Sequence, residues 1–137
     1  MTHEFREPTT AELMRFYDAA ILPKIDYAEG MFQDGELIAV GGILSDPVLV
    51  GSPIEEVARS VAFLDVKRQV RGADVLRRLR MRLNKERRMI WVQHDDAFPQ
   101  SERLLKVLGF IQTRETRNDF KHTGRQLRMW CRPVRVR

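Results

Sequence analysis

The sequence predicts an α/β fold, in which helices flank a mixed central β-sheet that has a parallel β-α-β core. Two strand-like runs are joined by Asp34-Gly35, a pair that favours a tight hairpin turn. An amphipathic helix over residues 75–86 is followed at once by the apolar run 89–92. Because a strand precedes that helix, the order of strand, helix and strand implies a parallel pair with a right-handed crossover.

The length and composition suit a single domain over residues 1–137. Hydrophobic residues make up 43% of the chain and charged residues 31%, a balance that can bury a core. No apolar run approaches the roughly 18 to 20 residues of a membrane span, and the first residues lack the apolar stretch of a signal peptide. We therefore expect a cytoplasmic protein with no membrane partner.

The cysteine and histidine residues argue against a metal centre. Cys131 is the only cysteine, so an internal disulfide and a cysteine-based cluster are excluded. The histidines lie far apart without helical ligand spacing, so we expect no metal cofactor. The net charge of +5 would attract polyanions, but no stacking platform or recognition motif accompanies it. Nucleic acid is therefore not an expected partner.

The N-terminus is predicted to form a short strand over residues 3–8 and then a helix. Thr9 and Glu12 have the spacing of a capping box at the start of that helix, which stops before Pro23. Its apolar face is expected to consist of Leu13, Phe16, Tyr17 and Ala20.

The hairpin strands are expected over residues 27–33 and 36–44. Residues 45–55 are predicted to form a loop, because they contain Pro47, Gly51 and Pro53. A further strand is expected over residues 59–66.

In the second half of the chain, the helix over residues 75–86 carries its leucines on one face and its basic residues mainly elsewhere. The run 89–92 suits a central strand that is covered on both faces. A short helix over residues 101–108 is expected to end at Gly109, and a strand restarts at Phe110.

A polar loop is expected over residues 116–125, followed by a last strand over residues 126–134. That strand is supported by the alternation of Leu127, Met129 and Cys131 with Arg128, Trp130 and Arg132. The complete order is then β, α, β, β, β, α, β, α, β, β.

Four segments carry a family resemblance: Ile38–Gly42, Ala62–Val66, Arg68–Ala73 and Leu104–Phe110. In this order and spacing they resemble the GNAT superfamily of N-acetyltransferases, over almost the whole chain. The resemblance implies acetyl-CoA as co-substrate and transfer of its acetyl group to an amine. It also implies that the backbone of Leu64, Asp65 and Val66 pairs with the pantetheine arm.

In that superfamily a glycine-containing loop before a helix holds the coenzyme A pyrophosphate, in keeping with the anion affinity of helix N-termini. The matching residues here are Arg68, Gln69, Val70, Arg71, Gly72, Ala73 and Asp74. A register from Gln69 puts Asp74 where a small residue is expected, and a register from Arg71 loses both glycines. Asp74 would cap the helix and repel phosphate, whereas Lys67, Arg68 and Arg71 would attract it. An ordinary capped helix with a solvated basic rim is the alternative.

Proton transfer requires further groups. The superfamily's acid, a tyrosine four residues before the helix-ending glycine, corresponds to Leu105, and its cofactor-binding asparagine corresponds to Phe98. Ser101 or a water molecule could replace the acid, although Ser101 could equally cap its helix.

Candidates for a general base follow the central strand at its carboxyl end, where ligands of open α/β sheets bind. They are His94, Asp95 and Asp96, and Asp65 in the preceding strand is a further candidate. The alternative is that these are solvated surface residues.

Two functions therefore stay open. The first is an N-acetyltransferase that acts on an amine of a small molecule or a protein. The second is a catalytically silent GNAT-like protein, similar to small acetyltransferase-like proteins of tailed bacteriophages, some of which are internal virion components. Expected partners are the amine substrate, a second copy of the chain in a homodimer, and a virion component. A phage-encoded chain would reside in the host cytoplasm or the virion.

Overall fold

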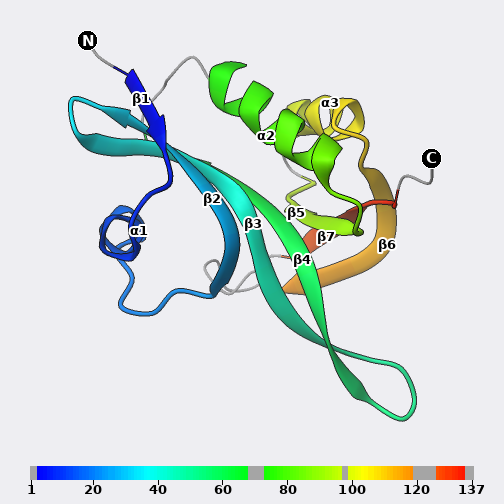
Figure 1. Cartoon of the computed structure of the whole chain (residues 1–137). Coiled ribbons are helices and arrows are strands. Elements are labelled where there is room, and N and C mark those ends of the chain that lie inside the picture. The colour runs from blue at the N-terminus through cyan, green and yellow to red at the C-terminus, as the bar shows by residue number, and fades with distance from the viewer. Residues whose placement is uncertain (1–2, 68–72, 97–98, 119–125, 135–137) are drawn as a thin grey trace. The chain divides into compact units, whose positions relative to one another are not determined.

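A computed structural model of the chain describes residues 3–67, 73–96, 99–118 and 126–134 (Figure 1). The order of its elements is the order that the sequence predicts. They are β1 His3–Arg6, α1 Thr10–Tyr17, β2 Lys24–Gln33, β3 Glu36–Val50, β4 Glu55–Val66, α2 Ala73–Lys85, β5 Ile90–His94, α3 Gln100–Val107, β6 Ile111–Asn118 and β7 Gln126–Arg132. No helix in the described part of the chain is long and apolar enough to cross a membrane.

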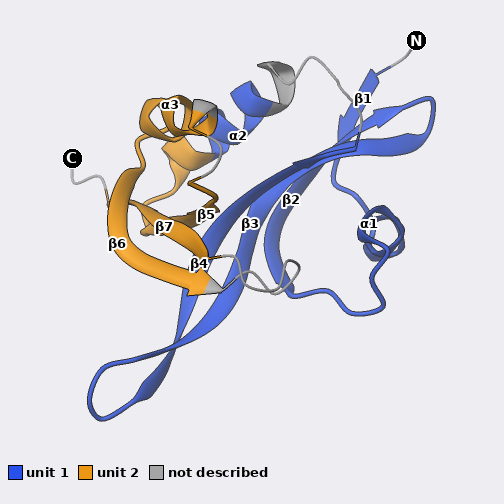
Figure 2. Cartoon of the chain, turned by 180° about the vertical axis from the view of Figure 1, so that it is seen from behind, with its two compact units in different colours: residues 1–82 blue, residues 83–137 orange. Residues whose placement is uncertain are grey.

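The chain divides into two compact units, residues 1–82 and residues 83–137 (Figure 2). In the first unit β1, β2, β3 and β4 pair in sequence order, and each pair is antiparallel. One core cluster joins α1 to the sheet and contains Leu13, Ala28, Phe32, Leu37 and Val40. A second cluster contains Met31, Ile38 and Ala39, with Phe5 and Leu64 packed against it.

The hairpin between β2 and β3 turns at Asp34-Gly35, as predicted. Both residues have positive φ angles, 50° and 84°, which is the backbone conformation that this pair accommodates. Farther along the hairpin the two strands approach very closely. A Cβ atom at Gly42 would lie 2.1 Å from the carbonyl oxygen of Tyr27, so only glycine fits at position 42.

The loop expected over residues 45–55 is wrong for most of its length. β3 continues to Val50 and β4 begins at Glu55, so only residues 51–54 form the turn. Pro47 lies opposite Ala58 in this extension, where β2 no longer flanks β3 because their pairing stops at Ser45. A proline at an open strand edge removes no hydrogen bond from the ladder, and therefore the strand continues through it.

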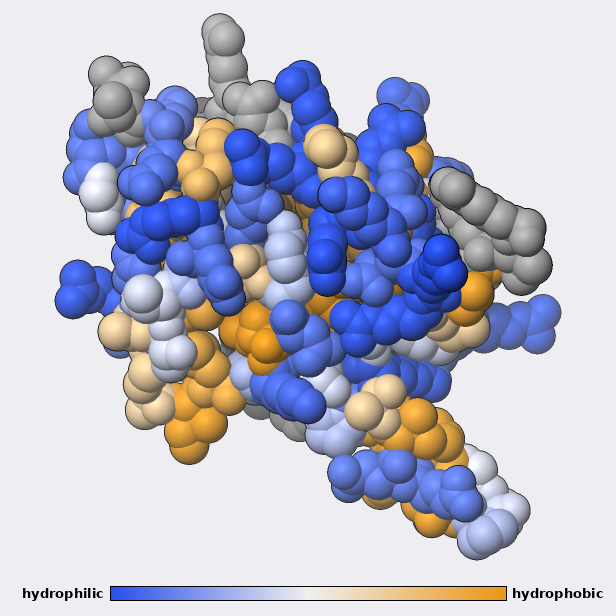
Figure 3. Space-filling view, in the orientation of Figure 1, coloured by the Kyte–Doolittle hydropathy of each residue, from blue (hydrophilic) through white to orange (hydrophobic). Residues whose placement is uncertain are grey.

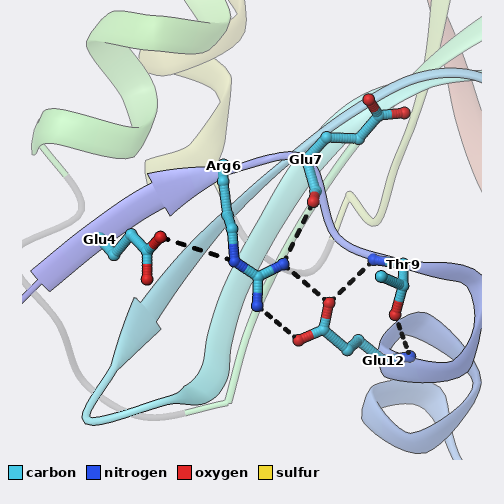
Figure 4. Close-up of polar contacts among 5 residues, drawn as sticks. All are labelled: Glu4, Arg6, Glu7, Thr9 and Glu12. Atoms are coloured by element: carbon cyan, nitrogen blue, oxygen red, sulfur yellow. Dashed lines mark hydrogen bonds and ion pairs between the residues drawn. The ribbon is translucent and has the colours of Figure 1, made fainter.

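The predicted capping box of α1 is present (Figure 4). The Glu12 backbone N–H donates to Thr9 Oγ1 at 3.2 Å, and the Thr9 N–H donates to Glu12 Oε1 at 2.9 Å. Arg6 at the end of β1 also binds the Glu12 carboxylate, with distances of 2.8 and 2.7 Å. The helix ends at Tyr17, earlier than expected, because Asp18 adopts a left-handed conformation with φ of 49°.

In the second unit β7 lies between β5 and β6 and is antiparallel to both. The predicted end of α3 is confirmed, since Gly109 follows it with φ of 91°. The loop expected over residues 116–125 is wrong at its start, because residues 116–118 extend β6 and pair with β7. Residues 119–125 lie outside the described part of the chain.

Arg132 in β7 is almost completely buried, although the alternation of the sequence sets it apart from the apolar positions. Its guanidinium donates to carbonyl oxygens and to a side-chain amide oxygen at the ends of α2 and α3. Trp130 on the same face and Met129 on the opposite face are buried as well, so both faces of β7 are covered.

Candidate active site

Tyr17, the last residue of α1, and Asp65, near the end of β4, come together in the first unit. The Tyr17 hydroxyl donates a hydrogen bond of 2.5 Å to Asp65 Oδ2. The Phe16 ring packs edge-on against the Tyr17 ring, with centroids 4.9 Å apart. Both aromatic side chains also border the core cluster beneath α1. The phenol is thus held by packing on one side and by the carboxylate on the other.

The environment of Tyr17 keeps its hydroxyl protonated. Burial raises the pKa of Tyr17 well above its usual range, and the hydrogen bond to the Asp65 carboxylate raises it further. Asp65 itself is exposed. A carboxylate has about four lone-pair positions, so one hydrogen bond from Tyr17 leaves it able to accept a proton from another molecule. The pair therefore consists of a neutral donor and an accessible carboxylate.

The backbone predicted to pair with pantetheine lies in the same region. Leu64, Asp65 and Val66 pair on one side with Gly41, Val40 and Ala39 of β3. The Lys67 N–H continues this ladder with a hydrogen bond of 2.8 Å to the Ile38 carbonyl oxygen. The Lys67 ammonium lies 5.1 Å from the centre of the Phe16 ring, which adds a positive charge beside the Tyr17–Asp65 pair.

The predicted pyrophosphate loop falls largely outside the described residues. Arg68, Gln69, Val70, Arg71 and Gly72 are not described, and of Ala73 and Asp74 only the backbone, at the start of α2, is described. The choice between the two registers and the capping role of Asp74 therefore stay predictions.

The second unit contains the other predicted catalytic residues. His94 is 7% exposed, so the interpretation of this residue as a solvated surface histidine is wrong. Its ring packs edge-on against Trp130, with centroids 5.9 Å apart. Asp95 is half-buried and Asp96 is exposed. The guanidinium of Arg128 pairs with Asp96 at 3.3 Å, which provides this carboxylate with a positive partner.

Ser101 lies half-buried within the first turn of α3. The residue at the cap position is Pro99, which makes no side-chain capping bond, so the capping role considered for Ser101 is wrong. Leu105, at the position of the superfamily's tyrosine, is buried. It is an apolar core residue and cannot donate a proton.

Glu102 of α3 joins His94 and Asp96 in a group of metal-ligand type. One ligand atom from each of the three side chains lies within 4.8 Å of the others. The sequence did not reveal this group. His94 ends β5, Asp96 follows it and Glu102 lies in α3, and these positions have no spacing that is typical of a metal site. The Arg128 guanidinium already binds the Asp96 carboxylate and would compete with a metal ion for it. The arrangement is therefore as compatible with a network of polar side chains as with a cation site.

Tyr17 is the residue of the site that the sequence reasoning missed. Both tyrosines belong to elements remote in sequence from the expected acid position, and no spacing connects Tyr17 with Asp65, 48 residues away. The other tyrosine, Tyr27, donates to Glu29 Oε2 at 2.6 Å. Burial first and this hydrogen bond second raise the pKa of Tyr27 to about 12.

A small hollow in the first unit is lined by polar groups that already satisfy one another. Glu29 accepts the hydrogen bond from Tyr27 and an ion pair from Arg78, and the Arg78 guanidinium lies 4.1 Å from the centre of the Phe5 ring. Arg82 stacks over the Tyr27 ring at 4.5 Å. These contacts hold α2 against β2. Because the polar groups of the hollow bind one another, the Tyr17–Asp65 pair is the better candidate for proton transfer to or from a substrate.

Comparison by sequence and comparison by structure give different results. No protein-family model matches the sequence, and no curated protein matches it. The structure is similar to that of a GNAT-family acetyltransferase from Streptococcus pneumoniae, with a TM-score of 0.65 at 11% identity, over 97% of this chain and 99% of that chain. The expected similarity to bacteriophage proteins has no support from the sequence comparisons.

Two further solved structures are similar over nearly the whole chain. The ribosomal-protein-S18-alanine N-acetyltransferase from Escherichia coli has a TM-score of 0.62 at 13% identity, over 99% of this chain and 96% of that chain. A GNAT superfamily phosphinothricin acetyltransferase from Sinorhizobium meliloti, in complex with AcCoA, has a TM-score of 0.61 at 15% identity, over 98% and 89%. At such identities the likeness shows the fold alone. It confirms the predicted class, a mixed α/β sheet with flanking helices.

Proposed function

We propose, from the premise of this GNAT fold, that the chain is an N-acetyltransferase that moves an acetyl group from acetyl-CoA to an amine. The observation that carries the proposal is the Tyr17–Asp65 hydrogen bond at the end of β4. It places an accessible carboxylate, already oriented by a neutral donor, beside the backbone expected to hold pantetheine. The similar S. meliloti enzyme was solved with AcCoA, which supports the choice of co-substrate.

The reaction forms a carbon–nitrogen bond and breaks the carbon–sulfur bond of the thioester. An alkylamine with a pKa near 10.4 must first lose a proton, and the thiolate that departs, with a pKa near 8.5, must gain one. We assign the first task to Asp65, because its carboxylate is exposed and can accept the proton. His94 and Asp95 remain the alternative bases, although His94 is buried in the second unit.

Tyr17 is a positioning residue in this scheme. Its raised pKa makes it a weaker acid than an ordinary phenol, so it does not suit protonation of the thiolate. The hydrogen bond instead fixes the orientation of the Asp65 carboxylate. Protonation of the departed thiolate is left to the solvent, and positioning of the reactants supplies much of the rate.

The expected coenzyme site combines the β4 backbone with the segment that follows it. Leu64, Asp65 and Val66 would pair with the pantetheine arm, and residues 68–74 would hold the pyrophosphate with Lys67 nearby. The test is titration calorimetry with acetyl-CoA and with coenzyme A at moderate salt, followed by thiol release with a panel of amines. Micromolar binding with acetyl transfer supports the proposal, and Arg71→Ala should then weaken coenzyme A binding.

A catalytically silent protein with a structural or partner-binding role is the second candidate. The observation that favours it is Leu105, which is buried where the superfamily has its acid. If neither acetyl-CoA nor coenzyme A binds at millimolar concentration, this second function replaces the first.

A further inference from the structure

The ends of β3 and β4 form an extension that the rest of the first unit does not flank. We call residues 46–59 the β3–β4 arm. Asp46 pairs with Arg59 at its base, and Val50 pairs with Glu55 next to the turn. The pairing of β2 with β3 stops at Ser45. The β3 edge of the arm therefore has no strand neighbour within the described residues (Figure 1).

The arm exposes large apolar side chains. Leu49 is 67% exposed, Ile54 71% and Val57 41%. In the space-filling view the projecting arm shows hydrophobic surface beside hydrophilic surface (Figure 3). Leu49 lies close to the turn and Ile54 within it, whereas Val57, opposite Val48, lies on the other face of the arm. Neighbouring exposed apolar side chains such as Leu49 and Ile54 are typical of a surface that another protein covers.

The charge of the arm indicates the kind of surface that would cover it. Asp46, Glu55 and Glu56 make the arm acidic, with Arg59 as the single basic residue, whereas the whole chain has a net charge of +5. Two arms would therefore repel each other if they paired edge to edge. A basic surface with some apolar character is the complementary partner.

The outer side of α2 has this character. Arg78 and Arg82 are engaged with the sheet through Glu29 and Tyr27. The side chains of Arg77, Arg80 and Met81 are exposed, with Met81 at 56%. These three residues, spaced three and four positions apart, share one side of the helix and form what we call the outer α2 face.

The arm cannot reach the outer α2 face of its own chain. Arg78 binds Glu29, which lies opposite Gly41, and Gly41 lies opposite Leu64 of β4. Leu49 pairs with Glu56 of β4, which precedes Leu64 by eight residues. Eight residues correspond to about 26 Å along a strand. No side chain spans that distance, so the complementary surfaces can meet only between two molecules.

We propose that the chain forms a homodimer in which the β3–β4 arm of each copy packs on the outer α2 face of the other. The exchange is reciprocal, so the two contacts are equivalent and the assembly closes as a two-fold dimer. Leu49, Ile54 and Met81 supply the apolar contact, and the acidic arm faces Arg77 and Arg80.

The test is sedimentation velocity of the full chain over a wide concentration range. The wild-type chain should dimerise. The double variant Leu49→Ser/Ile54→Ser should raise the dimer dissociation constant by at least about ten-fold, because burial of even one such side chain contributes about that factor. Arg80→Glu should weaken the dimer through charge repulsion. The matched control is Ile21→Ser, since Ile21 is 87% exposed but lies outside the arm, and it should leave the dimer unchanged.

A mixture of the two weakened variants separates this arrangement from other dimers. The double variant retains an intact α2 face and Arg80→Glu retains an intact arm, so the mixed dimer has one native contact and carries both changes in the other. A contact already lost to one change loses little more to the second, so the mixture should associate more tightly than either variant alone. A monomeric wild-type chain, a dimer indifferent to the arm variants, or a mixture without recovery would each overturn the proposal. None of these outcomes depends on acetyl-CoA, so the proposed activity is tested separately.

Discussion

The guanidinium of Arg132 donates a hydrogen bond of 2.9 Å from Nε to the carbonyl oxygen of Leu108, the residue that ends α3. The same group donates from Nη1 to the Leu83 carbonyl oxygen at 2.6 Å and from Nη2 to Asn84 Oδ1 at 2.8 Å. The last carbonyls of a helix lack partners within the helix and carry partial negative charge. One buried cation therefore stabilises the C-terminal ends of both α2 and α3.

Arg132→Met should lower the free energy of unfolding by about 3 kcal/mol, since it leaves buried carbonyl oxygens without donors. Arg132→Lys should fall between this variant and the wild type, because lysine keeps the charge but not the planar fork. Urea denaturation measures both. Arg103→Met removes an exposed arginine from α3 and should change stability by less than about 0.5 kcal/mol. Equal effects of the 103 and 132 substitutions would contradict this account of Arg132.

Neighbouring glycines in β3 should respond differently to alanine. A Cβ atom at Gly42 would lie 2.1 Å from the Tyr27 carbonyl oxygen, whereas the nearest atom to a Cβ at Gly41 is 3.5 Å away. Gly42→Ala should therefore destabilise the chain by about 2 kcal/mol or more, because β2 must shift. Gly41→Ala should have little effect. Thermal unfolding of the two variants distinguishes them, and similar melting temperatures would contradict the close approach of the strands.

Glu12 should make stability depend on pH in the acid range. The hydrogen bond from Arg6, followed by that from the Thr9 backbone, lowers the pKa of Glu12 from 4.5 to about 2. A lowered pKa in the folded state stabilises the fold above the unfolded pKa, and this contribution is lost as pH falls through the folded pKa. The stability difference between wild type and Glu12→Gln should thus be largest above pH 4.5 and disappear towards pH 2.

Glu7→Gln is the matched control for Glu12. In Figure 4 the Glu7 carboxylate points away from Arg6. The contact of Arg6 with Glu7 is made to the backbone carbonyl oxygen, which the substitution keeps. Denaturation curves of this variant should parallel the wild-type curves at every pH. A pH-independent difference between wild type and Glu12→Gln would show that the Arg6–Glu12 contact is absent in solution.

Asp65→Asn should reduce kcat for acetyl transfer by about a hundred- to ten-thousand-fold while coenzyme A binding persists, since only the proton acceptor is lost. Tyr17→Phe should produce a smaller loss of kcat and alter the pH–rate profile, because the carboxylate loses its donor. The matched control is Tyr27→Phe, which also removes a tyrosine-to-carboxylate hydrogen bond but away from Asp65, and it should leave kcat unchanged. Full activity of Asp65→Asn would transfer the role of base to His94 or Asp95.

Local signals in the sequence were sufficient for the element order. Asp34-Gly35 and Gly109 have the positive φ angles that these residues favour, and Thr9 with Glu12 forms the capping box. Each signal acts within a few residues, so it can be read without knowledge of the tertiary structure. The fold class followed from the same pattern.

Features that depend on distant partners could not be predicted in this way. Pro47 indicates a loop only if the strand has neighbours on both edges, and the open edge of β3 is a tertiary property. Arg132 is buried because its acceptors come from two helices. Tyr17 reaches Asp65 across 48 residues of sequence, so the best-supported part of the candidate site was not recognised.

The position of β7 between β5 and β6 constrains how the second unit is made. During synthesis β5 and β6 leave the ribosome before β7, and each then lacks the strand with which it pairs in this unit. A nascent chain that stops before Gln126 would expose two unsatisfied strand edges together with the α3 leucines. Vectorial folding can thus complete most of the first unit early, but the second unit must wait for residues 126–132, when chaperone protection matters most.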